Sequence, residues 1–203
     1  MSTVTAETFT TEDLAKLCGQ SFESYREWIP SKSRPDLTPK EELSNATLGL
    51  VGEIGELLDS IAEAETLSDW MQIPDEIGDC LFYLAWIHNA SDIPEPVFLL
   101  DDDFAKWGDG IGEVFDPRED IRTPAFRLAE LVKKHAYHGK DLSEEIAELL
   151  LSIGCHLFHL AKVVNEVARF DGGLGRIVER NVIKLESRYP GGFVLGGGIR
   201  ESK

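Results

Sequence analysis

Cysteine is scarce in this chain of 203 residues, which contains only Cys18, Cys80 and Cys155. The number is odd, and the three residues are far apart in the sequence, in apolar surroundings with a helical period. This pattern excludes a disulfide framework and offers no spacing typical of a zinc site. We therefore expect reduced thiols in a cytoplasmic protein.

Basic residues are also in short supply. The chain has 20 Lys and Arg against 37 Asp and Glu, which gives a net charge of −17 and an isoelectric point near 4.6. This balance excludes an extended electrostatic track for nucleic acid. A small anionic substrate stays open, because a bound divalent cation reverses the electrostatic field locally.

Two further patterns are missing. No uninterrupted apolar run approaches the roughly eighteen residues of a membrane-spanning helix, and the N-terminus lacks a basic region followed by an apolar stretch. We therefore expect neither a membrane span nor a signal peptide. The chain also contains no Glu-x-x-His, which argues against a ferritin-like di-iron bundle.

Apolar residues recur with a helical rather than an alternating period, so the sequence predicts an all-α fold. Thr38-Pro39-Lys40-Glu41 is typical of a helix start, and Ser143 is expected to cap a later helix. Residues 91–122 are richer in Pro, Gly and Asp and indicate a connecting segment, with one short helical candidate near Pro94–Trp107. The other expected helices run from about Thr11 to Trp28, Thr38 to Glu65, Ser68 or Pro74 to Asn89, Thr123 to His138, Ser143 to Phe170, and Leu174 to Arg188.

Two acidic pairs at three-residue steps lie in successive predicted helices: Glu53/Glu56 in GLVGEIGELLD and Glu76/Asp79 in PDEIGDCLFYLA. A step of three keeps both members on one helix face. The spacing alone is weak evidence in so acidic a chain, but the flanking residues are apolar and leave little room for a solvated face. Four carboxylates brought together would repel unless a cation held them, and oxygen ligands indicate Mg²⁺ or Mn²⁺.

Three glycines accompany the first pair. Gly49, Gly52 and Gly55 each cost a helix roughly 1 kcal/mol relative to alanine. They indicate a close approach by another helix or by a ligand. The alternative for the whole segment is a charged helix whose glycines only allow tight packing.

The chain also contains an internal similarity. EIGDCLFYLA (Glu76–Ala85) aligns without a gap to SIGCHLFHLA (Ser152–Ala161), and six of the ten positions are identical. In this register Glu76 corresponds to Ser152 and Asp79 to Cys155. The second copy has thus lost its acidic pair and kept its apolar frame. A chance likeness between two Leu-rich amphipathic helices is the alternative.

Together, LGLVGEIGELLD and EIGDCLFYLA, with nineteen residues between Glu56 and Glu76, resemble the ExxE…ExxD signature of MazG-like nucleotide pyrophosphohydrolases, a superfamily that includes the dimeric dUTPases. LAELVKKHAYHGK (Leu128–Lys140) and NVIKLESRYPGGF (Asn181–Phe193) resemble other parts of these proteins. The likeness covers most of residues 40–90 and 123–193. The acidic signature is intact only in the first half: Pro124 and Arg127 stand where the second half should carry its first acidic pair.

The resemblance implies helical units that pair, here fused in one chain as an intrachain pseudo-dimer. Residues 1–90 would form the unit with the metal site, 91–122 a connector, 123–193 a degenerate second unit and 194–203 a tail. Such a protein would be either a monomeric pseudo-dimer or a homodimer.

The activity that the resemblance implies is hydrolysis of a nucleoside triphosphate to a nucleoside monophosphate and pyrophosphate. Glu53, Glu56, Glu76 and Asp79 would bind Mg²⁺, or Mn²⁺, and one of the glutamates would take a proton from the attacking water. Candidate contacts to the substrate are Asn181, Lys184 and Arg188 on one stripe of the last helix, and Lys133 and Lys134.

Each of these basic residues has a plainer alternative. Arg188 is equally typical of a basic residue favoured by the dipole at a helix C-terminus. The cluster with Lys133 and Lys134 is equally compatible with a solvated helix end. The alternative for the whole chain is a non-catalytic helical protein that senses nucleotides or binds a partner and has lost turnover.

Overall fold

The computed structural model describes residues 22–29, 36–90, 120–170 and 173–189. Within these ranges the regular structure is entirely helical and contains no strand, which confirms the all-α prediction. The helices are α2 (Phe22–Trp28), α3 (Pro39–Glu63), α4 (Leu67–Trp70), α5 (Ile73–Ala90), α7 (Arg122–His138), α8 (Ser143–Ala168) and α9 (Gly173–Arg188).

Several sequence predictions lie outside the described residues. They include the N-terminal part of the first expected helix together with the expected absence of a signal peptide, and most of the connecting segment with its helical candidate Pro94–Trp107. Cys18 and the tail at 194–203 lie outside as well.

The start of α3 follows the sequence prediction closely. The Thr38 hydroxyl accepts the Glu41 backbone N–H at 3.4 Å, while the Glu41 carboxylate accepts the Thr38 N–H at 2.9 Å. This reciprocal capping box satisfies two backbone donors that the first turn leaves without helical partners. Pro39 occupies the first helical position, where the missing N–H costs nothing.

At two other helix starts the structure decides between or departs from the predictions. Of the two expected starts of the third helix, Pro74 agrees with the structure, since α5 begins at Ile73. Ser68 lies in the separate short α4, which Thr66 and Asp69 start with a capping box of their own. Ser143 is not a helix cap. Its N–H and hydroxyl instead both donate to the Asp141 carboxylate, at 3.3 and 2.5 Å, and Leu142 stands at the cap position without a side-chain bond. The neighbouring aspartate is a stronger acceptor than the predicted serine.

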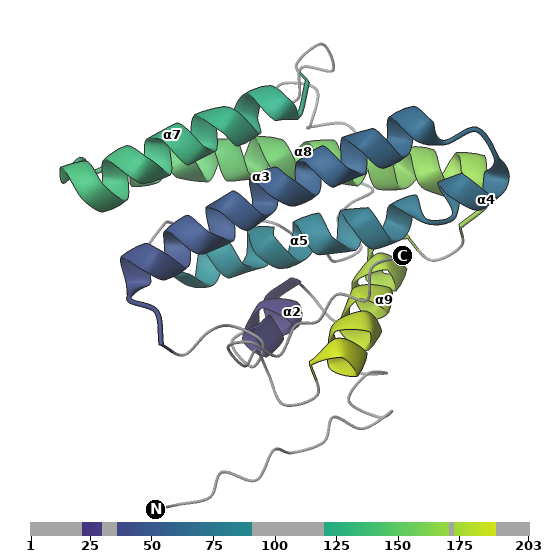
Figure 1. Ribbon diagram of the computed structural model, residues 1–203, viewed down its shortest axis with the longest axis horizontal. Helices are drawn as coiled ribbons and strands as arrows, with labels where there is room; N and C mark the ends of the chain where they lie inside the picture. Colours follow the sequence, from purple (N-terminus) through teal and green to yellow (C-terminus); the bar gives the residue numbers. More distant parts are fainter. Residues whose placement is uncertain (1–21, 30–35, 91–119, 171–172, 190–203) are drawn as a thin grey trace, which may run out of the picture.

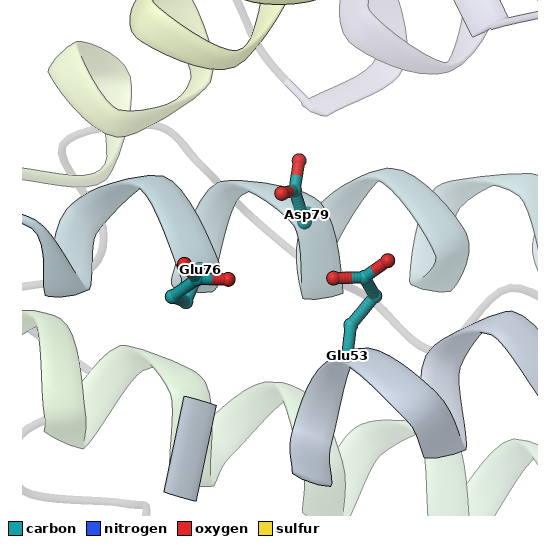
Figure 2. Close-up of side chains that lie close together, drawn as sticks. All are labelled: Glu53, Glu76 and Asp79. Carbon is teal, nitrogen blue, oxygen red and sulfur yellow. The ribbon is translucent and has the colours of Figure 1, made fainter. Parts of the chain in front are cut away.

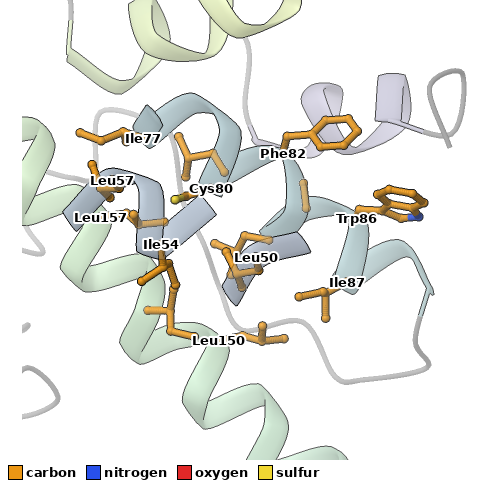
Figure 3. Close-up of a cluster of buried hydrophobic side chains, with 14 of the residues drawn as sticks. Leu50, Ile54, Leu57, Ile77, Cys80, Phe82, Trp86, Ile87, Leu150 and Leu157 are labelled. Carbon is orange, nitrogen blue, oxygen red and sulfur yellow. The ribbon is translucent and has the colours of Figure 1, made fainter. Parts of the chain in front are cut away.

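Four helices form the body of the molecule (Figure 1). The α3 helix packs along α5 and α7, and α8 packs along the same two helices, so that the four enclose one core. Both α2 and α9 lie to one side of this bundle and pack against α5. Figure 3 shows the centre of the core, where Leu57 of α3 lies beside Ile77 of α5 and Leu157 of α8.

Each half of the chain contributes two long helices to this bundle. One pair is α3 with α5 and the other is α7 with α8, and the pairs meet through α3 with α7 and α5 with α8. These four contacts are compatible with a two-fold relation between the halves. In the sequence alignment of the two copies, Ile77 and Ile153 correspond, as do Leu81 and Leu157, and all four are buried. The observed packing is therefore compatible with the predicted pseudo-dimer, which stays a prediction.

Within the described ranges, α8 alone is long and apolar enough to cross a membrane by length and composition. We expected no such helix, because no uninterrupted apolar run approaches eighteen residues. Of its most apolar stretch, 44% is buried inside the bundle, where Ile146, Leu150 and Ile153 belong to the core. These properties are also those of a core helix in a soluble bundle, so they are weak evidence for a membrane span.

Candidate metal centre

Three acidic side chains converge where α3 packs along α5 (Figure 2). Glu53 comes from α3, Glu76 and Asp79 come from one face of α5, and one carboxylate oxygen from each lies within 4.8 Å of the others. All three are partly buried. The three-residue step on α5 sets its pair on one face, and the helix packing brings Glu53 across from it. Three of the four predicted ligands are therefore close together.

Glu56, the fourth predicted ligand, stands outside this group. It lies one turn along α3 from Glu53 and is exposed. Its negative charge still acts on the site, because it is one of the charges that raise the pKa of Glu53. A direct role for Glu56 in metal binding stays a prediction.

Burial and mutual repulsion make the group electrostatically unfavourable without a cation. Burial first, and then the charges of Asp79, Glu56 and Glu76, raise the pKa of Glu53 to about 7 against the opposing effect of Lys184. Burial and the charge of Asp79 also raise the pKa of Glu76. At neutral pH, Glu53 is thus close to its midpoint between the protonated and ionised forms.

The last described helix supplies donors to this group. Lys184 donates from Nζ to Asp79 Oδ2 at 2.5 Å, and Asn181 donates from Nδ2 to Asp79 Oδ1 at 2.7 Å. Asn181 is only 1% exposed, so in this structure its amide supports Asp79 rather than facing solvent. Two of the predicted substrate contacts therefore lie at the acidic group, and both come from the second half of the chain.

The other three predicted substrate contacts lie apart from it. Arg188 is exposed near the end of α9. Lys133 and Lys134 both pair with Glu130 on the surface of α7, at 2.6 and 3.0 Å. Within the described residues, no recorded contact joins any of the three to the acidic group, so their role in binding stays a prediction.

Sequence reasoning missed the residues that fasten α9 to α5. Arg180 donates from Nε and Nη2 to both oxygens of Asp75, at 2.9 and 2.7 Å. The sequence did contain a signal for this contact. Asp75 and Asp79 are four positions apart, and so are Arg180 and Lys184. Two helices with matched four-residue steps of opposite charge are well suited to lie side by side.

Tyr25 is a second missed residue. Its hydroxyl donates to Asn181 Oδ1 at 2.8 Å, although the two residues are 156 positions apart. The ring is buried, and it stacks on Trp28 with a centroid separation of 5.9 Å. No short-range sequence pattern predicts a contact between residues so far apart.

The glycines of this region divide into two kinds. At Gly49 an added Cβ would lie 2.1 Å from the Tyr83 ring, and at Gly78 it would lie 3.0 Å from Asn181 Cβ, so both positions allow a close approach by another helix. At Gly52 and Gly55 nothing lies within 4 Å of an added Cβ. The predicted helix approach is confirmed at Gly49, and an approach by a ligand at the other two stays a prediction.

The corresponding positions of α8 carry no such chemistry. Cys155, aligned with Asp79, is 4% exposed, and Cys155 and Cys80 are both free thiols, as we expected. Ser152, aligned with Glu76, has its backbone oxygen 2.8 Å from His156 Nδ1. In the described part of the chain, Glu53, Glu76 and Asp79 are the one group of three or more side chains placed to hold a metal ion.

Comparison of the chain with protein-family models, with curated proteins and with solved structures finds no match.

Proposed function

We propose that this protein is a Mg²⁺-dependent nucleoside triphosphate pyrophosphohydrolase of the MazG-like type, which forms a nucleoside monophosphate and pyrophosphate. The observation that carries the proposal is the convergence of Glu53, Glu76 and Asp79 from two packed helices. These are three of the four residues that match the ExxE…ExxD signature. The proposed substrate is a standard, damaged or deoxy nucleoside triphosphate.

The residues present fit a hard divalent cation. All the donor atoms are carboxylate oxygens, which suit Mg²⁺ and Mn²⁺, and no histidine or thiol belongs to the group. The raised pKa values of Glu53 and Glu76 reflect a repulsion that a bound cation would relieve. When bound, the ion would neutralise charge on phosphate oxygens and lower the pKa of a coordinated water.

The chain's own residues then have distinct roles in the proposed reaction. Glu53, Glu76 and Asp79 would hold the cation, and one of the two glutamates would accept the proton of the attacking water, as a general base must. Lys184 is the cation bound directly to the acidic group, and we assign it to the triphosphate. The open surface at Gly52 and Gly55 leaves room beside Glu53 for the remainder of the substrate.

The proposal includes a fused pair with one site retained and one lost. It is supported by the two long helices that each half contributes to the bundle and by the shared buried positions of α5 and α8. Asn181 and Lys184 come from the half that carries no acidic group, which is the arrangement expected when one half supplies donors to a site in the other.

The direct test is a panel of nucleoside and deoxynucleoside triphosphates incubated with purified protein and Mg²⁺, with pyrophosphate and monophosphate measured together. We expect equimolar release of the two products from at least one substrate, and loss of release with a chelator or in Glu53→Gln. Measurable nucleotide binding with no pyrophosphate from any substrate would contradict the proposal and favour a nucleotide-sensing protein.

A further inference from the structure

A chain of hydrogen bonds leads from the buried side of α2 to the acidic group. The Tyr25 hydroxyl donates to Asn181 Oδ1 at 2.8 Å, and Asn181 Nδ2 donates to Asp79 Oδ1 at 2.7 Å. Tyr25 and Asn181 are each 1% exposed. Hydrogen bonds in such a dry setting are strong and are costly to leave unmade.

The two bonds hold the Asn181 amide from both ends. An ionised carboxylate only accepts hydrogen bonds, so Asp79 selects the Nδ2 end of the amide. The Tyr25 hydroxyl donates to the Oδ1 end and thereby fixes the position of the amide against the carboxylate. Burial raises the pKa of Tyr25 well above its usual value, and the charge of Asp79 adds to this, so the hydroxyl keeps its proton at neutral pH.

Tyr25 and Asn181, the two residues that lead to Asp79, are themselves held in place by other contacts. Trp28, which stacks on Tyr25, donates from Nε1 to Glu186 of α9 at 3.0 Å. Asn181 packs directly against α5 at Gly78. A Cβ added to Gly78 would lie 3.0 Å from the Cβ of Asn181. The amide thus has little freedom to move away from Asp79.

We propose that Tyr25 and Asn181 are positioning residues of the metal centre, which hold Asp79 in one orientation so that its carboxylate is preorganised to bind a divalent cation. The inference rests on the proposed function in that it assigns a cation to the acidic group. It adds that α2, which carries no part of the acidic signature, contributes to the affinity for that cation. Loss of a supporting contact of this kind typically lowers metal affinity by about 10- to 100-fold.

The test compares two Tyr→Phe variants that each lose one hydroxyl and keep the ring. Tyr25→Phe removes the donor to Asn181. Tyr137→Phe is the matched control, because its hydroxyl bonds to Ser44 at 3.0 Å on an exposed part of α3 and α7. The measurement is the affinity of the nucleotide-free protein for Mg²⁺ by calorimetry, with Mn²⁺ as a spectroscopic probe. We expect Tyr25→Phe to weaken binding by about tenfold, and the control to leave it unchanged.

A double-mutant cycle separates positioning from packing. If Tyr25 acts through Asn181, its loss has little further effect on Mg²⁺ affinity in the Asn181→Ala background, so the two changes are strongly non-additive. A merely structural role would lower the melting temperature of the metal-free protein and leave the Mg²⁺ affinity of Tyr25→Phe equal to that of the wild type.

The outcomes distinguish this inference from the proposed function. A wild-type protein that binds no divalent cation overturns both. A wild type that binds Mg²⁺, together with a Tyr25→Phe variant that binds it equally well, overturns the role of Tyr25 and leaves the proposed function standing. Because Tyr25→Phe alters one hydroxyl and retains the buried ring, this single variant decides the matter even if Asn181→Ala folds poorly.

Discussion

The segments Glu76–Ala85 of α5 and Ser152–Ala161 of α8 share six of ten residues, and both helices belong to the four-helix bundle, yet only the first segment carries acids. Their common residues include the buried core positions, so the bundle needs the apolar frame and not the carboxylates. Asp79 is accompanied by donors from Asn181 and Lys184, whereas the Cys155 thiol has no hydrogen-bond partner among the described residues. A buried charge persists where partners support it, and elsewhere an apolar side chain is more stable.

The largest expected effect is on activity, when variants of the acidic residues are compared with variants at the aligned positions of the second half. We expect Glu53→Gln and Asp79→Asn each to lower pyrophosphate release by at least about a thousandfold, roughly 4 kcal/mol of transition-state stabilisation, because each removes a charged ligand. Ser152→Ala and Cys155→Ala, the matched changes in the second half, should leave the rate within about twofold of the wild type. Steady-state kinetics at saturating Mg²⁺ measure all four variants. Equal losses in both halves would mean that the second half is not a degenerate copy.

Placing an acid in the second half tests why it is missing there. Cys155→Asp puts a carboxylate at a position that is 4% exposed, without the donors that accompany Asp79. We expect unfolding free energy to fall by about 3 kcal/mol, since an uncompensated charge is buried. Cys155→Ser is the control of similar size without a charge, and denaturant unfolding at pH 7 measures both. A Cys155→Asp protein as stable as the control would show that α8 tolerates acids without support.

The pH dependence of stability should also differ between the halves. The pKa of Glu53 is raised from its usual 4.5 to about 7, so the folded metal-free state holds this proton more tightly than the unfolded chain. The resulting stabilisation is fully present below pH 4.5 and is lost as the pH rises through 7. After allowance for solvent screening we expect a loss of about 1 to 2 kcal/mol across this window.

The measurement is the unfolding free energy at several pH values in a chelator. Glu53→Gln should flatten the decline and be more stable than the wild type above pH 7. Glu148→Gln, an exposed glutamate of α8, is the control and should follow the wild-type curve. Mg²⁺ should restore most stability at high pH, where Glu53 is ionised. A decline of the same size in Glu53→Gln would place its origin elsewhere.

Local rules were sufficient to predict much of this fold. The capping box at Thr38 and the helical period located α3 to within two residues of its observed end at Glu63, and the three-residue steps placed two acids on one face of α5. These features depend on residues a few positions apart. Helix geometry alone decides which side chains of one helix share a face, so this part of the arrangement could be predicted.

The contacts that organise the site could not be predicted in the same way. Tyr25 reaches Asn181 across 156 positions, and Arg180 reaches Asp75 across 105, so both depend on how α2 and α9 dock. Docking is decided by packing and charge over whole helix surfaces, and patterns of residues a few positions apart do not reveal it. The same limit separates Glu56 from Glu53, because only the packed structure shows which member of an acidic pair turns outward.

The smallest expected effect concerns glycine, which is frequent in α3 and absent from α7, the helix that the proposed pseudo-dimer pairs with it. Nothing lies within 4 Å of an added Cβ at Gly52 or Gly55, so alanine at either position should stabilise the ligand-free protein by about 0.5 to 1 kcal/mol. Gly78→Ala is the contrasting control. Its Cβ would press on Asn181, which is held by hydrogen bonds to Tyr25 and Asp79, so this variant should lower the stability of the protein. Urea unfolding measures the three variants. If the bare surface beside Glu53 admits the substrate, Gly52→Ala should gain stability and raise KM together, whereas glycines without a ligand to accommodate would give the gain alone.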